Sequence, residues 1–433
     1  MNALLRGGSV LAGLAAFAAL HGTAARLAAQ GLPRARPAEL GLDSARLADV
    51  RTLLDDAVAR GEVAGVVTLL ARNGRVAAVD SAGFQDTAGR ARAGLRTLFR
   101  IGSMTKPVTS VAAMILVEEG ALRLSDPVAR YLPELAGMRV MAPDGSVVPA
   151  RTPITVRHLL THRAGFTYGF LDDGPVGDAY RAGGVSDGVA PREGETIASN
   201  VARLARVPLA AEPGTRFVYG LSTDVLGRVV EVASGESLAR YLSRRIFEPL
   251  GMHDTAFHVD SAAVPRLAAA FAWNGRALRP LRGIEQLGLL RIAGEGYHGS
   301  RTWFSGGSGL VSTAGDYARF LQMILNGGEL DGARILSARS VALLGTDAIA
   351  DLTDRPLGPG AGFGLGFQVL TDTALAEVPG SEGTLSWSGV YGTTFWADRE
   401  RRLIGIVMLQ RVPSASLGIS GRFRRIAYAA VTR

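Results

Sequence analysis

The chain of 433 residues lacks cysteine altogether and has a single lysine, Lys106, among its 47 Lys and Arg residues. Without cysteine it can form no disulfide and offers no attachment site for the lipid of a lipoprotein. Its positive charge is carried almost entirely by arginine. Only Lys106 has an aliphatic side-chain amine, a group that releases its proton far more readily than a guanidinium does.

The charge balance is basic, with a formal net charge of +8 and a sequence pI of about 10.2. Such a charge would permit nucleic-acid binding. The arginines, however, are scattered among acids and are not gathered with the aromatic residues, which make up 6% of the chain. The dense run from Arg399 to Arg402 includes Glu400 and falls where a turn is expected. We therefore expect no nucleic-acid partner.

The N-terminal residues have the pattern of a secretory signal peptide. Arg6 supplies a positive charge, Val10 to Leu20 is an apolar run too short to span a bilayer, and Thr23 to Ala25 provides small residues for cleavage. This pattern predicts a signal peptide over residues 1–25, a periplasmic or secreted protein, and no stable membrane association after cleavage. An uncleaved anchor remains an alternative, because alanine-rich runs are retained when the cleavage site is poor.

Strand-like runs occur early and late in the chain. Gly65–Ala71 and Val76–Ser81 flank Asn73-Gly74, a strong hairpin signal. The late runs are separated by short turns, which indicates antiparallel pairing. They are Gly364–Thr371, Thr384–Trp387, Gly392–Ala397 and Leu403–Gln410.

The spacing of apolar residues predicts helices over Ser44–Arg60, over Met104–Glu119, and from a capping box at Thr313 and Asp316 through Leu325. Hydrophobic residues make up 47% of the chain, enough for a large core. After a linker over residues 26–40, we expect one folded region over residues 41–433. The expected class is α/β: an antiparallel sheet flanked by helices, from about 41–102 and 300–433, with a mainly helical insertion over about 103–299.

Ser103 and Lys106 are three residues apart, a spacing that places both side chains on one face of a helix. A serine hydroxyl needs a nearby base to become a nucleophile, and a desolvated amine can serve as one. A serine that caps a helix beside a surface lysine would give the same pattern. The chemical interpretation is favoured because Lys106 is the single lysine of the chain. All the remaining Lys and Arg positions are arginine, which cannot act as a base.

The run from Phe99 to Lys106 resembles the class C β-lactamase and serine-esterase family, which is related to penicillin-binding proteins. Leu159 to Gly165 is similar to that family's "LLTHTSG" run, and Phe217 to Ser222 to its second motif. Gly309 to Thr313 and Trp387 to Gly389 resemble the later motifs. The resemblance covers roughly Gly41 to Gln410 and implies a β-lactamase/transpeptidase-like fold.

The resemblance also implies roles for particular residues. Tyr219 would be the base or acid that works with Lys106. The backbone N–H groups of Ser103 and of Val390, which follows Trp387-Ser388-Gly389, would bind the oxyanion of the tetrahedral intermediate. Such donors typically contribute on the order of 100- to 1000-fold in rate.

The sequence departs from the β-lactamase pattern in two motifs. Leu221 stands where a Tyr-x-Asn motif has asparagine, with Ser222 next to it as a possible substitute. Trp387-Ser388-Gly389 stands where the family has Lys-Thr-Gly, so the lysine that attracts a substrate carboxylate is missing. A tryptophan offers apolar area instead of charge, which favours esters or small amides as substrates.

We expect no metal or other cofactor. His158 and His162 are spaced i, i+4, but the run between them lacks the glutamate of the zinc-protease motif and no third ligand is evident. The glycine-rich Gly358 to Gly366 does not match a nucleotide-binding loop. No Gly-x-Ser-x-Gly elbow occurs, which argues against an α/β-hydrolase.

The sequence thus predicts an exported serine hydrolase that forms an acyl-enzyme on Ser103 and acts on small carboxylic esters or amides. A β-lactamase, a D-alanyl-D-alanine carboxypeptidase or a D-aminopeptidase is the nearest alternative. A non-hydrolysing sensor of penicillins or peptidoglycan is a second one. The joint presence of Ser103, Lys106 and Tyr219 argues against the sensor, which has no chemical need for all three.

Overall fold

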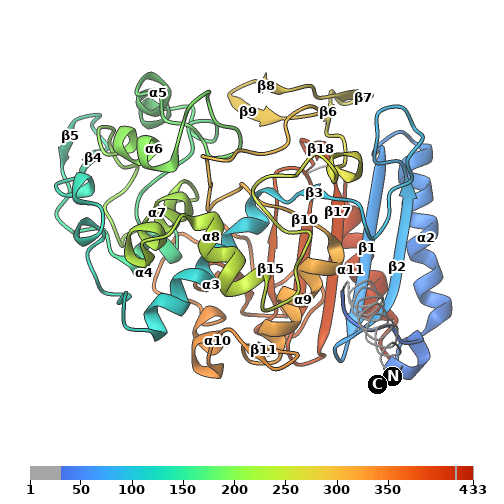
Figure 1. Ribbon diagram of the computed structural model, residues 1–433. Helices are drawn as coiled ribbons and strands as arrows, with labels where there is room; N and C mark the ends of the chain where they lie inside the picture. The colour runs from blue at the N-terminus through green and yellow to red at the C-terminus, as the bar shows by residue number, and fades with distance from the viewer. Residues whose placement is uncertain (1–30, 415–416, 433) are drawn as a thin grey trace, which may run out of the picture.

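The centre of the molecule is a seven-stranded antiparallel sheet with strand order β13-β14-β15-β16-β17-β1-β2. The computed structural model describes residues 31–414 and 417–432, so the predicted signal peptide over 1–25 lies outside the described residues. Because β17 (Leu403–Leu409) pairs with β1 (Gly65–Arg72), early and late parts of the chain form one sheet (Figure 1). The other strands of this sheet are β2 (Arg75–Gly83), β13 (Ala361–Phe363), β14 (Gln368–Leu370), β15 (Leu385–Ser388) and β16 (Thr394–Asp398).

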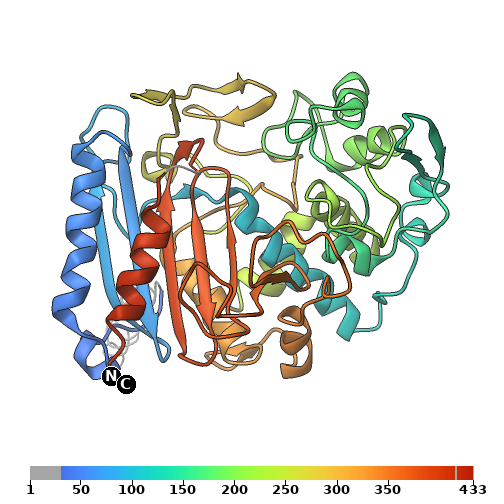
Figure 2. The same cartoon turned by 180° about the vertical axis from the view of Figure 1, so that it is seen from behind.

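Helices cover both faces of the sheet. The helices α2 (Ser44–Ala59) and α11 (Ile419–Ala429) lie across one face (Figure 2), and α3 (Thr105–Glu118) and α9 (Ala314–Leu325) lie on the other. The sequence of strand β1 is almost continuously apolar because both faces of the strand are buried. Val66 packs in the core that contains residues of α2, and Val67 packs in the core that contains residues of α3. A strand buried on both faces has no polar alternation.

The remaining elements are mostly short. The other α-helices are α4 (Val156–Leu160), α5 (Pro175–Ala182), α6 (Ile197–Leu204), α7 (Ser222–Ser234), α8 (Leu238–Leu242) and α10 (Ala338–Leu344). The other helical turns are η1 (Pro37–Leu40), η2 (Gly102–Met104), η3 (Val128–Arg130), η4 (Pro133–Leu135), η5 (Ser243–Phe247) and η6 (Val264–Arg266). The other strands are β3 (Phe99–Arg100), β4 (Arg139–Met141), β5 (Val147–Pro149), β6 (Phe271–Trp273), β7 (Leu278–Pro280), β8 (Ile284–Leu287), β9 (Leu290–Ala293), β10 (Val311–Ser312), β11 (Glu329–Leu330), β12 (Ala333–Arg334) and β18 (Arg411–Val412).

The predicted antiparallel sheet flanked by helices is confirmed, and so are the first hairpin and the three long helices. The region between α3 and α9 contains α4 to α8 and also the antiparallel strand pairs β4–β5, β6–β7 and β8–β9. The capping box of α9 is only half formed. Thr313 accepts from the Asp316 N–H, but the Asp316 carboxylate accepts from Thr255 and from the Asp254 N–H instead.

The predicted strand over Gly364–Thr371 is confirmed only in its second half, as β14, because the chain turns sharply between β13 and β14. Gly366 has φ +90°, a conformation that L side chains rarely adopt. A Cβ atom there would lie 2.0 Å from the Ser110 Oγ of α3. The turn therefore needs glycine, and it brings the end of the sheet close to α3.

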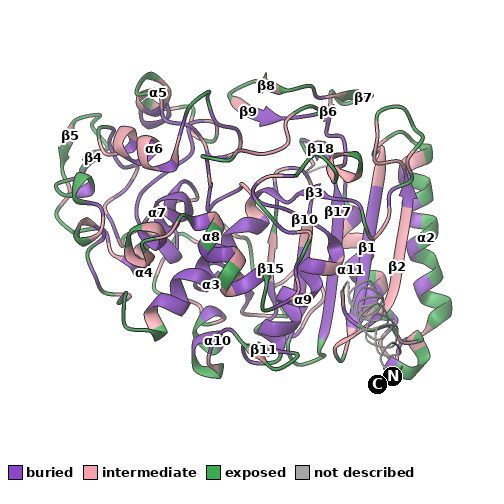
Figure 3. Cartoon of the chain, viewed as in Figure 1, coloured by how far each residue is buried: buried purple, intermediate pink, exposed green. Residues whose placement is uncertain are grey.

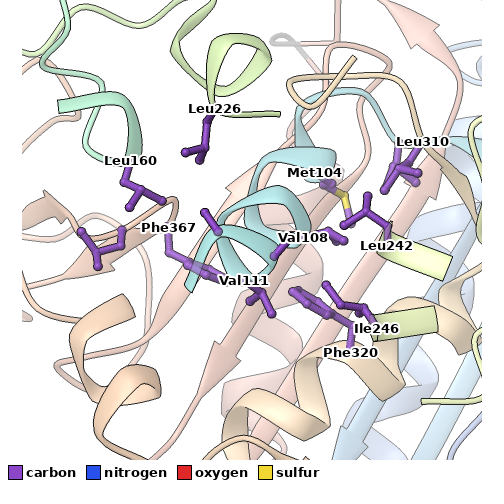
Figure 4. Packing of buried hydrophobic residues seen from close by; sticks show 14 of the residues in the cluster. Met104, Val108, Val111, Leu160, Leu226, Leu242, Ile246, Leu310, Phe320 and Phe367 are labelled. Atoms are coloured by element: carbon purple, nitrogen blue, oxygen red, sulfur yellow. The ribbon is translucent and has the colours of Figure 1, made fainter. Parts of the chain in front are cut away.

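Helix α3 runs through the interior of the molecule, and every residue from Thr105 to Leu116 is buried (Figure 3). Around it, Met104, Val108 and Val111 pack with side chains from α7, α8 and α9, among them Leu226, Leu242 and Phe320 (Figure 4). Each such buried side chain contributes roughly 1.5–3 kcal/mol of hydrophobic stabilisation. The N-terminal end of α3 is therefore held firmly in place. Within residues 31–414 and 417–432, no helix is both long and apolar enough to cross a membrane.

Candidate active site

Ser103 and Lys106 meet at the N-terminal end of α3. Ser103 lies in the turn η2, and Lys106 in the first turn of α3 has its Nζ 3.1 Å from the Ser103 Oγ. The Lys106 side chain is fully buried. Its Nζ also donates to the Tyr168 hydroxyl at 2.9 Å and to the Gly307 carbonyl at 2.8 Å. Three acceptors match the three N–H bonds of an ammonium group.

Tyr168 was not predicted from the sequence. It follows α4 by a short loop and is 2% exposed. Burial, together with the nearby Tyr219 and the carboxylates of Asp224 and Asp187, raises the pKa of Tyr168 well above its usual value. Its hydroxyl therefore keeps its proton. Tyr168 is a neutral partner that holds Lys106 in place.

Tyr219 approaches Lys106 through the face of its ring, whose centroid is 4.8 Å from the Nζ atom. The ring also contacts Tyr168 edge-on at 5.5 Å and Trp387 at 5.4 Å between centroids. The structure thus brings Ser103, Lys106 and Tyr219 into one site. A cation over an aromatic face is stabilised by the ring quadrupole, by about 2 kcal/mol when the cation is desolvated.

The chain after β15 lies directly beside the Ser103 turn. A Cβ atom on Gly102 would lie 3.0 Å from the Val390 N, and one on Gly389 would lie 2.2 Å from the Ile101 carbonyl oxygen. The Thr393 hydroxyl donates to that same carbonyl at 3.0 Å. Two glycines thus let the backbones of η2 and of the Val390 segment approach closely, as two convergent N–H donors require.

A cavity of about 560 Å³ adjoins Tyr219 and Trp387. Apolar side chains from the α5 region and from the segment before β13 supply much of its wall. Its lining consists of Thr167, Asp172, Pro175, Val176, Ala210, Arg216, Phe217, Val218, Tyr219, Pro356, Leu357 and Trp387. Its volume lies within the usual range for small-molecule sites.

Ser222 and Ser388 take no part in the hydrogen bonds around Lys106. Ser222 begins α7 and is fully buried, and its Oγ has no hydrogen-bond partner among the described residues. Ser222 was offered as a possible substitute for the missing motif asparagine, but the side chain that contacts the Lys106 amine is that of Tyr168. Ser388 ends β15 and is exposed, whereas Trp387 before it lines the cavity.

The two histidines with i, i+4 spacing, His158 and His162, contact a helix cap and aromatic rings. His158 accepts from the Thr155 N–H and completes the cap of α4. His162 is buried among aromatic rings, with its centroid 4.9 Å from that of Tyr219. Burial and then the charge of Lys106 hold the pKa of His162 well below its usual value, so the imidazole is neutral. In the part of the chain that the structure describes, no three His, Cys, Asp or Glu residues are grouped as a metal site.

The chain has clear relatives among known proteins. The family model described as Beta-lactamase matches residues 50–430. Esterase EstB of Burkholderia gladioli is 35% identical over 89% of this chain and 95% of its own length. Protein Rv1367c of Mycobacterium tuberculosis is 36% identical over 82% of this chain and 88% of its own length. The solved structure of EstCE1, "a hydrolase with promiscuous acyltransferase activity", is 31% identical, with a TM-score of 0.78 over 89% of this chain and 99% of that one.

Proposed function

Because the chain belongs to the Beta-lactamase family, in which it resembles esterases, we propose that it is an exported serine hydrolase that cleaves small carboxylic esters through an acyl-enzyme on Ser103. One observation carries this proposal: the Ser103 Oγ lies 3.1 Å from the buried amine of Lys106, at the start of a helix. The positive end of the helix dipole favours the negative charge that develops on the serine oxygen.

In the proposed reaction, the Ser103 oxygen attacks the ester carbonyl while its proton passes to the pair formed by Lys106 and Tyr219. The carbonyl oxygen becomes an oxyanion, which the N–H groups of Ser103 and Val390 stabilise. The ester C–O bond then breaks, and the alcohol leaves with the proton that the pair returns. Water next attacks the acyl-enzyme, loses its proton to the same pair, and releases the carboxylic acid and free Ser103.

The cavity beside the site supports esters over substrates with a free carboxylate. Trp387, Phe217 and Leu357 give it an apolar surface. The one cationic side chain among the described residues that line it, Arg216, is paired with Asp354 at 3.3 Å. An uncharged acyl or alcohol group gains from contact with such a wall, whereas a carboxylate would have to compete with Asp354 for the guanidinium.

Two other activities remain as alternatives. A β-lactamase, D-alanyl-D-alanine carboxypeptidase or D-aminopeptidase would use the same Ser103 acyl-enzyme. Acyl transfer to an alcohol instead of water is the second, and the similarity to EstCE1, with its promiscuous acyltransferase activity, favours including it. Short-chain p-nitrophenyl esters, nitrocefin, a D-alanyl-D-alanine peptide and an added alcohol as acceptor separate these outcomes.

Labelling with a fluorophosphonate tests the nucleophile directly. We expect the wild-type protein to gain the mass of one phosphonyl group and to hydrolyse p-nitrophenyl butyrate. Ser103→Ala should lose both properties. Ser146→Ala, at an exposed loop serine, is the matched control and should keep both. Ester hydrolysis by Ser103→Ala at the wild-type rate would refute the assignment. N-terminal sequencing of protein recovered from the periplasm or the medium tests export and cleavage.

A further inference from the structure

A buried carboxylate is connected to Lys106 through a single glycine. Asp224 lies in the first turn of α7 and is 2% exposed. Its Oδ1 accepts from the Ser305 hydroxyl at 2.5 Å and from the Gly307 N–H at 3.3 Å. The carbonyl of that same Gly307 accepts from the Lys106 Nζ at 2.8 Å. The carboxylate and the amine therefore hold opposite sides of one residue.

Two glycines leave space for the Asp224 carboxylate, but none of the salt bridges among the described residues includes it. A Cβ atom added to Gly307 would lie 2.4 Å from the Asp224 Oδ2, and one added to Gly188 would lie 3.0 Å from it, so both positions suit glycine. Among the described residues this oxygen has no hydrogen-bond partner, and no arginine forms a salt bridge with Asp224. A buried carboxylate in this state costs stability.

Electrostatics connect the two groups. Burial raises the pKa of Asp224, and the positive charge of Lys106 is the largest of the influences that lower it. The attraction is mutual, because a buried anion stabilises a nearby buried cation to the same extent. In the low dielectric of the interior this effect is much larger than it would be in water.

We propose that Asp224 is a positioning residue that keeps Lys106 in its ammonium form in the resting enzyme, by anchoring the Gly307 carbonyl and by supplying the compensating negative charge. This inference rests on the proposed function of the Ser103 site. Its consequence is that the amine of Lys106 does not accept the Ser103 proton. We assign the acceptance of that proton to Tyr219, whose ring faces the ammonium group.

Several other titratable groups lie near Asp224 and Lys106, and their effects on a pH profile must be distinguished from the effect of this pair. His162 is neutral, as described above, and Tyr168 keeps its proton. Burial raises the pKa of Asp187 to about 6, so Asp187 can contribute to the low-pH side of an activity profile. The groups facing Asp224 or Lys106 are Tyr168, Tyr219, His162 and Asp187, and Asp187 is in turn faced by Arg181 and Arg192.

The solitary lysine allows a direct measurement. Protein grown with lysine labelled with ¹³C at Cε has one labelled side chain, so its chemical shift reports the protonation of Lys106 alone. We expect the wild-type signal to remain that of an ammonium through neutral pH. In Asp224→Asn the compensating negative charge is gone, so the ammonium signal should be lost at lower pH than in the wild-type protein. This measurement needs no substrate, so it tests the inference even if no ester is hydrolysed.

Activity provides the second arm. The high-pH side of the kcat/KM profile of Asp224→Asn, measured from about pH 5 to about pH 10, should also move to lower pH. Asp316→Asn is the matched control, because Asp316 is also a buried aspartate in the first turn of a helix. It should leave the profile unchanged. Ser305→Ala, which removes one hydrogen bond but keeps the charge, should leave it nearly unchanged, and Asp187→Asn should affect only its low-pH side.

Two results would overturn the proposal. If the Lys106 signal has the same pH dependence in folded Asp224→Asn as in the wild type, the carboxylate only stabilises the loop that contains Gly307. A neutral Lys106 in the wild-type protein at neutral pH would make the amine the base. If Asp224→Asn does not fold, the second result can still be obtained from the Lys106 signal of the wild-type protein.

Discussion

Replacing Tyr168 by phenylalanine isolates the hydroxyl group that the structure adds to the site. The variant keeps the ring, which stacks on Phe170 at 5.1 Å and meets Tyr219 edge-on at 5.5 Å. It removes the oxygen that accepts from the Lys106 Nζ at 2.9 Å. A hydrogen bond to a charged group contributes about 1.5–3 kcal/mol. If the full amount is lost in the transition state, kcat/KM should fall by about 10- to 150-fold.

The assay is the hydrolysis of p-nitrophenyl butyrate under conditions where kcat and KM are measured separately. We expect most of the loss in kcat, because a displaced amine affects proton transfer more than substrate contact. Tyr241→Phe is the matched control. Tyr241 is also buried, but its hydroxyl has no hydrogen-bond partner among the described residues, so its removal should leave activity near the wild-type level. A Tyr168→Phe variant within about twofold of the wild type would refute a role for this hydroxyl, given that one lost charged bond is expected to cost about tenfold or more.

Three further outcomes follow from the structure. Gly366→Ala should lower the free energy of unfolding by about 1–3 kcal/mol or more, because its Cβ atom would meet Ser110 at 2.0 Å; Gly120→Ala, with a similar φ but open space around it, should cost less in the same urea titration. Val176→Trp should narrow the cavity and reduce turnover of long-chain esters while p-nitrophenyl acetate is still hydrolysed, and equal losses on both would contradict this placement of the substrate. Burial raises the pKa of Asp316 from 3.8 to about 6, so its stabilising contribution is full below about pH 4 and is lost as the pH rises to about 6. Relative to Asp316→Asn, the wild-type protein should therefore lose up to about 3 kcal/mol of stability over that interval, and equal pH dependence of the two proteins would argue against it.

The sequence pointed to Ser103 as the nucleophile that we propose, because Ser103 and Lys106 are close in the chain and their chemistry is local. Helix α3 and the first hairpin were also predictable, since their signals depend on neighbouring residues. The resemblance to a known family supplied Tyr219, Trp387 and the segment containing Val390. No local pattern could have shown that these segments meet at one end of α3.

Tyr168 could not be predicted for a different reason. Its hydroxyl reaches Lys106 from a loop 62 residues further along the chain, and its neighbourhood stood out in the sequence only as the run from Leu159 to Gly165. The Gly307 carbonyl is a backbone group and leaves no trace in the sequence at all. The turn at Gly366 was missed because glycine inside an apolar run indicates a bulge or a close approach only after the neighbouring helix is known.

The pairing of β17 with β1 has a consequence for how the protein is made. A ribosome delivers Val66 long before its partner Leu409, so the centre of the sheet is open for most of synthesis. Until the last strands emerge, the apolar strand β1 has only β2 beside it, and contacts of such long range form slowly. A chain truncated before residue 403 would lack β17, so that β1 and β16 would each lose a pairing partner. Ser103, the proposed nucleophile, is thus translated well before the strands that complete the sheet beside its site.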